Sequence, residues 1–214
     1  MLENFKKAIF RALCCVLIGG GGLMAEPNPE ELFDLGVKSI EAKDYIQAKK
    51  YFEKACDLNN GSGCGVLGFL YGSGKGVEKN LIKAAYFYSK ACDLNNGGGC
   101  GNLGVLYQKG EVVEKNLTKA AYLYSKACDL NNGSGCGVLG FLYGSGKGVE
   151  KNLIKAAYFY SKACELKESF GCGALGGLYY NGDGVKRDSK KADQYFSKAC
   201  KLGDQEACEA LKEK

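Results

Sequence analysis

Two stretches of the chain, Ala55 to Cys92 and Ala127 to Cys164, are identical at each of their 38 positions. The segment between them, Ala91 to Cys128, departs from this unit mainly in the loops and at a few helix positions. A fixed period of a few tens of residues indicates a solenoid, in which each repeat contacts only its neighbours. The chain is therefore predicted to be a repeat array.

Cysteines mark the period of this array. Five of them lie 36 residues apart, and each has a partner eight positions further along the chain. The resulting pairs are Cys56 and Cys64, Cys92 and Cys100, Cys128 and Cys136, Cys164 and Cys172, and Cys200 and Cys208.

Each repeat is predicted to be a pair of α-helices. In residues 44–57, for example, Tyr45, Ala48, Phe52 and Ala55 recur at helical spacing. Asn80 and Ser62 are the expected N-caps of two of the helices. The helical segments expected from this pattern are 30–41, 44–57, 64–71, 81–91, 100–107, 117–130, 136–143, 153–166, 172–180 and 188–202, with a glycine-rich loop at 72–79 and a polar capping piece at 204–214.

Glycine makes up 32 of the 214 residues, about twice its usual share. A glycine destabilises a helix by roughly 1 kcal/mol relative to alanine, because it loses more chain entropy on folding. An array with this composition needs a compensating constraint, and the cysteines can supply one.

The N-terminus resembles a secretory signal peptide. Basic residues precede an apolar stretch, a small residue follows at Ala25, and a polar segment begins at Glu26. We place cleavage after Ala25, so that 1–25 is the signal peptide and 26–214 the mature repeat domain. The alternative is an N-terminal membrane anchor, although the apolar run is shorter than the roughly 20 residues that span a bilayer.

Cleavage would remove Cys14 and Cys15 and leave ten cysteines in five pairs. Disulfides persist in secreted and periplasmic proteins, and this is where the chain is expected to be located. The formal charge of +5 would fall by two units, because residues 1–25 hold three basic residues and one acidic residue. Such a mild, evenly spread charge excludes nucleic acid as the expected partner, and no membrane span remains after cleavage.

The repeats resemble a known family. Leu35-Gly36, Ala48 and Phe52 sit at tetratricopeptide spacing, and the later units keep Leu67-Gly68, Tyr71, Ala84, Tyr88 and Ala91 while adding Gly-x-Gly-Val in the loop. This is similar to the Sel-one-like variant of the repeat. Together with the cysteine pairs and the signal peptide, residues 29–214 look like the Helicobacter cysteine-rich family of secreted repeat proteins.

The resemblance implies an all-α, right-handed α/α superhelical solenoid of about five disulfide-linked helix pairs plus a C-terminal capping helix, and a monomer. Its repeats would span about 29–60, 61–96, 97–132, 133–168 and 169–204, with the cap at 204–214. The resemblance also implies penicillin binding and β-lactamase activity.

Each cysteine pair straddles the joint between two helices, which favours a disulfide across the joint. Closing a nine-residue loop stabilises the chain by about 2.5 kcal/mol on the chain-entropy model. Metal binding and redox chemistry are the alternatives. No Cys-x-x-Cys occurs, and zinc sites usually pair cysteines two to four positions apart. No metal and no cofactor are therefore expected.

The catalytic residues expected of a β-lactamase are missing. The chain has no histidine, and no Ser has Lys three positions later. Ser-Asp-Asn and Lys-Thr-Gly are also absent, so the motifs of the serine enzymes do not occur. Any hydrolysis of β-lactams would need another arrangement, and its catalytic residues are unknown.

The surface expected to bind a partner is the concave one, which the first helix of each pair lines in tetratricopeptide arrays. Small residues there either form a groove for an extended peptide or simply allow close helix packing. Tyrosines such as Tyr88 and Tyr124 are interpreted as packing groups. The candidate groove residues are Phe69, Asn102, Gln108, Phe141, Tyr180 and Asn181.

Two functions remain open at this stage. One is an interaction scaffold that binds a peptide, a peptidoglycan-like or β-lactam ligand, or a host protein. The other is a hydrolase that acts on β-lactams. The scaffold needs no nucleophile, whereas the hydrolase needs an activated one, and the sequence offers no evident pair of residues for it.

Overall fold

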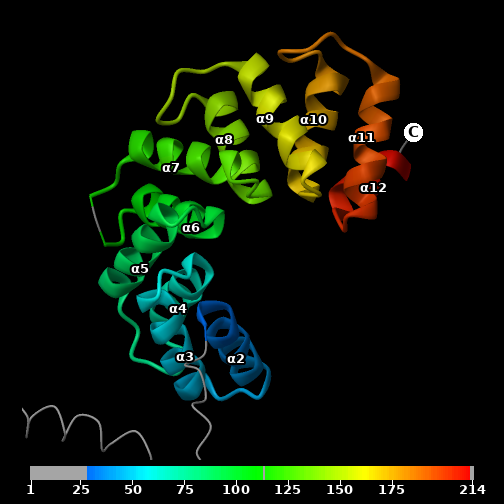
Figure 1. The fold of residues 1–214 in the computed structure, drawn as a ribbon. Helices are drawn as coiled ribbons and strands as arrows, with labels where there is room; N and C mark the ends of the chain where they lie inside the picture. Colours follow the sequence, from blue (N-terminus) through cyan, green and yellow to red (C-terminus); the bar gives the residue numbers. More distant parts are fainter. Residues whose placement is uncertain (1–27, 113, 213–214) are drawn as a thin grey trace, which may run out of the picture.

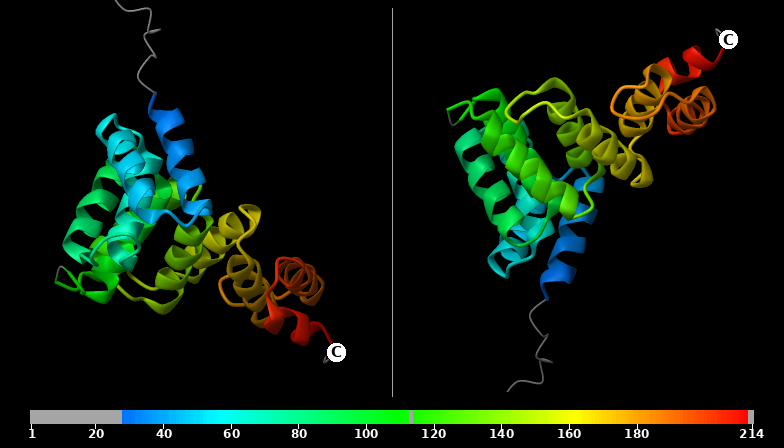
Figure 2. Two further views of the ribbon diagram at one scale, coloured as in Figure 1. Left: turned by 90° about the horizontal axis from the view of Figure 1, so that it is seen from below. Right: turned by 90° about the horizontal axis from the view of Figure 1, so that it is seen from above.

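The computed structural model describes residues 28–112 and 114–212, and within these ranges it contains helices and no strands. The helices stack side by side along an arc that twists into a superhelix (Figures 1 and 2). The solenoid predicted from the repeat is thereby confirmed. The helices are α2 (Pro29–Glu41), α3 (Tyr45–Asp57), α4 (Gly61–Ser73), α5 (Leu81–Asp93), α6 (Gly97–Lys109), α7 (Leu117–Asp129), α8 (Gly133–Ser145), α9 (Leu153–Glu165), α10 (Ser169–Asn181), α11 (Ser189–Lys201) and α12 (Gln205–Lys212).

The first helix of each cysteine-bearing repeat is longer than the sequence pattern indicated. Helix α4 spans Gly61–Ser73, whereas residues 64–71 were expected, and Gly72 lies in the helix and not in the loop. The helix ends at Gly74, which has a φ of 75° and donates its N–H to the carbonyl of Leu70. Glycine adopts this left-handed conformation at little cost, so it stops the helix two residues later than the glycine-rich composition suggested.

The expected N-cap at Ser62 is wrong. Asn60 caps α4 instead, because its side-chain oxygen accepts the backbone N–H of Gly63 at 2.7 Å. The preceding residue, Asn59, has a φ of 63° and follows the last turn of α3. Two consecutive asparagines thus end one helix and begin the next, which leaves Ser62 inside α4. The expected cap of α5 at Asn80 is confirmed, since its side chain accepts the N–H of Lys83.

Within each repeat an aromatic ring packs directly on a glycine. A Cβ built on Gly68 would lie 2.7 Å from the ring of Tyr88, a separation that no side chain tolerates. The absence of a side chain at this glycine therefore brings the two helices together and buries the ring. The same pairing joins Gly36 to Phe52, Gly104 to Tyr124, Gly140 to Tyr160, and Gly176 to Phe196.

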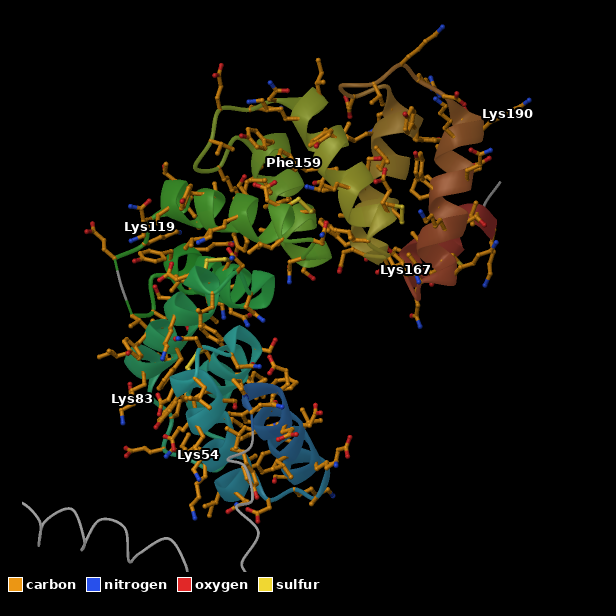
Figure 3. All side chains as sticks on the ribbon, in the orientation of Figure 1. Lys54, Lys83, Lys119, Phe159, Lys167 and Lys190 are labelled. Carbon is orange, nitrogen blue, oxygen red and sulfur yellow. A yellow bond between two sulfur atoms is a disulfide. The ribbon has the colours of Figure 1, made fainter. Side chains whose placement is uncertain are left out.

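Consecutive repeats are joined at one end by the disulfide turn. The cysteine Cα atoms in these turns are 4.5 to 4.8 Å apart. At the other end the long loop lies against the previous repeat, where a Cβ on Gly148 would be 2.6 Å from the backbone of Leu117. Each interface between repeats is therefore held at both ends, by the disulfide turn and by the loop. In Figure 3, Lys83, Lys119 and Lys190 lie along the outer margin of the arc, and Lys167 in the α9–α10 turn lies on its inner side.

The two ends of the described array differ from its middle. Helix α2 carries no cysteine, unlike the first helices of the later repeats, and α12 is a short helix without a second helix after it in the described residues. None of the described helices is both long and apolar enough to span a bilayer. The proposed signal peptide, residues 1–25, lies outside the described part of the chain.

Candidate functional site

A pocket of about 230 Å³ lies where helices α4, α5 and α6 meet. Three helices from two successive repeats build it, so it belongs to the array and not to one repeat. Phe69 comes from α4, Tyr88 from α5 and Asn102 from α6. Two of the candidate groove residues, Phe69 and Asn102, are thus brought together. The remaining lining residues are Gly72, Ser73, Leu81, Ala84, Val105 and Leu106.

The walls of this pocket are apolar and partly open to solvent. Phe69 is 47% exposed although it is a large apolar side chain. Next to it, Gly72 has no side chain to cover the Tyr88 hydroxyl, since a Cβ there would lie 3.7 Å from that oxygen. Burial raises the pKa of Tyr88, so its hydroxyl stays protonated at neutral pH. No hydrogen bond within the described residues occupies this hydroxyl.

A positive charge accompanies the aromatic ring. The Lys75 ammonium lies 5.6 Å from the centroid of the Phe69 ring and 5.7 Å from that of Tyr45. Cation–π attraction holds a lysine over such a ring with about 0.5–1 kcal/mol at an exposed site. Among the described residues, no acidic side chain lines the pocket. The site therefore combines an apolar wall, neutral hydrogen-bond donors and a cation.

The second identical repeat reproduces this arrangement. Phe141 is 41% exposed, and the Lys147 ammonium lies 5.6 Å from its ring centroid. A Cβ on Gly144 would lie 4.0 Å from the Tyr160 hydroxyl, which again has no hydrogen-bond partner in the described residues. Burial raises the pKa of Tyr160 as well. We call these two sets the α4 site (Phe69, Gly72, Lys75, Tyr88) and the α8 site (Phe141, Gly144, Lys147, Tyr160).

In the intervening repeat, which we call closed, the equivalent tyrosine hydroxyl is already hydrogen-bonded. Gln108 stands where the neighbours have glycine, and its Oε1 accepts a 2.7 Å hydrogen bond from the Tyr124 hydroxyl. Burial raises the pKa of Tyr124 to about 12. The candidate groove residue Gln108 is therefore engaged inside its own repeat. Glu111 replaces the lysine of the α4 site, and its carboxylate lies 3.6 Å from the Lys109 ammonium.

The last two candidate groove residues lie together at the end of α10. Asn181 donates from its side-chain nitrogen to the Asp183 carboxylate at 3.2 Å. The Arg187 guanidinium lies 5.9 Å from the centroid of the Tyr180 ring. Both side chains thus have local partners, and neither contributes to the pocket formed by α4, α5 and α6.

All ten paired cysteines form disulfides in the i, i+8 arrangement. The bonds join Cys56 to Cys64, Cys92 to Cys100, Cys128 to Cys136, Cys164 to Cys172, and Cys200 to Cys208. Sulfurs bonded in this way have no thiolate to offer a metal. The described residues contain no group of three or more histidine, cysteine or acidic side chains that could hold a metal ion.

The hydroxyl groups near the pocket are not arranged for nucleophilic attack. Ser73 donates to the backbone carbonyl of Phe69 at 2.8 Å, and Ser145 makes the same bond to Phe141. A serine nucleophile needs a base to accept its proton, and a carbonyl of its own helix cannot serve as one. The Tyr88 hydroxyl, whose pKa burial raises, is a weak nucleophile at neutral pH.

Sequence reasoning did not identify Tyr88 and Lys75 as site residues. Tyr88 was interpreted as packing, and its ring is indeed buried, with 7% of the residue exposed. A signal was nevertheless present in the differences between repeats. The intervening copy changes Phe69 to Val105, Gly72 to Gln108 and Lys75 to Glu111; the first two positions line the pocket, and the lysine of the third lies over the Phe69 ring.

A larger opening of about 470 Å³ lies between α3 and α5. Leu67 and Phe87 form its apolar part, while Lys50, Glu53 and Lys54 on α3 contribute charges of both signs. The Lys49 ammonium beside this group bonds to Glu53 at 2.7 Å, which raises the pKa of Lys49. Charges that neutralise one another in this way make it a weaker candidate than the α4 site.

Comparison with known proteins identifies the family of this chain. The Sel1 repeat family matches residues 32–60, 63–96, 99–132, 135–168 and 169–204. HcpC of Helicobacter pylori strain J99, described as a candidate β-lactamase, is 62% identical over 81 residues. That match covers 38% of this chain and 28% of HcpC, so the matched part spans little more than a quarter of this relative's length.

Solved structures show the same architecture. A Sel1 repeat protein from Oxalobacter formigenes superposes with a TM-score of 0.77 at 32% identity, covering 84% of this chain and 74% of that one. Cysteine-rich protein B of Helicobacter pylori gives a TM-score of 0.52 at 44% identity, over 62% of this chain and 96% of that one. With five matched repeats and five disulfides at a common spacing, this chain belongs to the Sel1 repeat family and, within it, to the Helicobacter cysteine-rich proteins.

Proposed function

We propose that this protein is a disulfide-stabilised interaction scaffold that binds peptide segments of partner proteins along the first helices of its repeats. The observation that carries the proposal is the pocket between α4, α5 and α6. An exposed phenylalanine at its edge and a tyrosine hydroxyl that is not buried and has no partner in the described residues offer apolar contact and hydrogen bonding together. Sites of this composition orient ligands with a few polar groups in an apolar cleft.

Binding accounts for this site better than hydrolysis does. The relative HcpC is described as a candidate β-lactamase, so a β-lactam is a reasonable small ligand to test. The hydroxyls of Ser73 and Ser145 are nevertheless bonded to backbone carbonyls, and no base accompanies them. A pocket that binds without a nucleophile agrees with the scaffold and does not explain turnover.

The scaffold is proposed to work outside the cytoplasm. Its disulfides persist in secreted and periplasmic proteins and are rare in reducing compartments. Cleavage of the proposed signal peptide after Ala25 would deliver the chain there.

The test uses oxidised protein spanning residues 26–214 and an array of immobilised twelve-residue peptides of varied composition. The double variant Phe69→Ala/Phe141→Ala should lose most binding, because it removes the exposed ring from both open sites. Its matched control is Ile82→Ala/Ile154→Ala, which changes apolar side chains that are 73% and 72% exposed on the second helices. The control should bind as the wild type does.

Two outcomes would contradict the proposal. One is an array on which the wild type binds no peptide. The other is a Phe69→Ala/Phe141→Ala variant that binds as the wild type while the isoleucine control loses binding, which would place the interaction surface on the second helices.

A further inference from the structure

We propose that the groove contains two related recognition sites, the α4 site and the α8 site, separated by a closed repeat, and that each takes an apolar side chain with an adjacent carboxylate from an acidic peptide. This inference rests on the proposed function and specifies its ligand. It follows from the chemistry of the sites and from the way the intervening repeat departs from them.

The apolar part of the ligand is set by the pocket. Its volume of about 230 Å³ is below the range of sites that hold a whole drug-sized molecule, and suits a single side chain. Leu81, Val105 and Leu106 surround this space, and the Phe69 ring borders it. Burial of one leucine-sized side chain in such a place stabilises a complex through the apolar area removed from water.

The charge of the ligand follows from the groups around the pocket. Lys75 brings an ammonium to the Phe69 ring, and Tyr88 and Asn102 bring neutral hydrogen-bond donors to the lining. The Asn102 side chain is exposed, and the Tyr88 hydroxyl has no partner in the described residues. Hydrogen-bond donors and a nearby cation, at a pocket whose lining has no acidic side chain, are complementary to a carboxylate.

The intervening repeat loses each of these features. Val105 has no ring to form the wall that Phe69 forms, and Gln108 accepts the hydrogen bond of the tyrosine hydroxyl. Glu111 reverses the charge that Lys75 provides, and it is paired with Lys109. Removal of the wall, the donor and the cation together is the expected pattern of a repeat that serves as a spacer.

The two sites are not fully equal. Around the α4 site the next first helix contributes Asn102 and Val105, and the equivalent positions of the first helix after α8 hold Ala174 and Gly177. A Cβ on Gly177 would meet nothing within 4 Å, so the α8 site has more open space and one donor fewer. The α4 site should therefore bind the same peptide more tightly than the α8 site does.

The experiment measures stoichiometry and affinity by isothermal titration calorimetry with oxidised protein of residues 26–214. The probe is an acetylated, amidated peptide that contains a single Leu-Glu pair in a glycine and serine background. The expected result is two peptides per chain, with affinity that falls as salt rises. Replacing the probe's Glu with Gln should weaken binding about tenfold, because a charge-assisted hydrogen bond is lost.

Variants taken from the chain itself provide the sharpest test. Phe69→Val/Gly72→Gln/Lys75→Glu copies the closed repeat into the α4 site and should reduce the stoichiometry from two to one. The reverse change at the two positions of the closed repeat that do not line the α4 pocket, Gln108→Gly/Glu111→Lys, should add weaker binding at a third site. Both sets of residues already exist beside nearly identical second helices in this chain, and circular dichroism checks that the helices are retained.

Several outcomes separate this inference from the proposed function. An unchanged stoichiometry in both grafted variants, or equal affinity for the Glu and Gln probes, would overturn the inference. If the Phe69→Ala/Phe141→Ala variant still lost binding on the peptide array, the scaffold itself would stand. Two further probes are tested. One is the Gln peptide with a free C-terminal carboxylate, and the other is benzylpenicillin. Tighter binding of either one than of the Glu probe would show that the carboxylate comes from another source than an acidic side chain and would overturn the assignment.

Discussion

The Tyr124 hydroxyl donates a 2.7 Å hydrogen bond to Oε1 of Gln108, sixteen residues earlier in the preceding helix. In the two flanking repeats, the equivalent hydroxyls of Tyr88 and Tyr160 face a glycine and have no partner among the described residues. Each of the three tyrosine rings packs on a glycine, and only the Tyr124 hydroxyl makes this polar contact. This difference allows the contribution of that contact to be measured within one protein.

Replacing Tyr124 with Phe should lower the free energy of unfolding by about 1 kcal/mol, since a part-buried hydrogen bond is lost and Gln108 is left without its partner. The measurement is urea unfolding followed by circular dichroism. Tyr88→Phe is the matched control, because it removes the hydroxyl of the equivalent buried tyrosine, which bonds to nothing in the described residues. It should change stability by less than half as much, and equal losses for the two variants would disprove the assigned role of the contact.

The same tyrosine should make the protein sensitive to high pH. Burial raises the pKa of Tyr124 to about 12, whereas an unfolded tyrosine titrates near 10. Below pH 10 both states keep the proton, and the stability is fully present. Between about pH 10 and 12 the unfolded state ionises first, so stability falls as the pH rises.

Urea unfolding at pH 8, 10 and 11.5 checks this dependence. Tyr124→Phe should lose less stability than the wild type over this range, so that the gap between the two proteins narrows. A gap that stays constant would mean that the raised pKa of Tyr124 does not affect stability.

Reduction of the disulfides should destabilise the array severely. Each bond closes a nine-residue loop and stabilises the fold by about 2.5 kcal/mol on the chain-entropy model, and the five together reach the 5–15 kcal/mol typical of a whole domain. Intact mass should increase by two hydrogen atoms per disulfide. Thermal unfolding before and after reduction measures the loss.

The position of a disulfide should matter as well. Cys128→Ala/Cys136→Ala removes a bond whose sulfurs are fully buried in the middle of the array, whereas Cys200→Ala/Cys208→Ala removes the last one, beside the short helix α12. A repeat in the middle is stabilised by two neighbours, and a repeat at the end by one. The Cys128→Ala/Cys136→Ala variant should therefore lose more stability than the Cys200→Ala/Cys208→Ala variant. The reverse order would show that the ends limit the stability of this array.

Incubation with benzylpenicillin should give no covalent adduct. The Ser73 and Ser145 hydroxyls donate to backbone carbonyls, and neither has a base that could activate it. Intact-mass measurement of the oxidised protein, together with hydrolysis of a chromogenic cephalosporin, checks this expectation. A stoichiometric adduct on one serine, or turnover like that of a dedicated β-lactamase, would reveal an active site that these contacts do not show.

Much of the architecture could be predicted from local patterns in the sequence. The 36-residue period determines a stack of similar helix pairs, since each repeat buries its apolar face only against its neighbours. The expected helices all occur, although α4 begins at Gly61 and ends at Ser73 because Asn60 and Gly74 set its ends. Caps depend on the conformation of one or two residues, which composition alone does not specify.

The candidate site was predicted only in part. Phe69 and Asn102 were placed on the groove, and they meet in the pocket between α4, α5 and α6. Gln108 was assigned to the same groove, yet it bonds to Tyr124 within its own repeat. Spacing predicts the helix face on which a side chain lies, but not which residue of the neighbouring helix it will meet.

The sequence by itself thus determined the repeat, its helices and the cysteine spacing, because these follow from periodicity along the chain. The tertiary structure decided which tyrosine hydroxyls stay open and which is closed, because that depends on a contact between residues sixteen positions apart on different helices. It also decided that Phe69, Tyr88 and Asn102 share one pocket. The reason is physical: the pocket exists only when two repeats pack, because the ring of Tyr88 resting on Gly68 sets the spacing of α4 and α5, and the Cys92–Cys100 turn joins α5 to α6 of the next repeat.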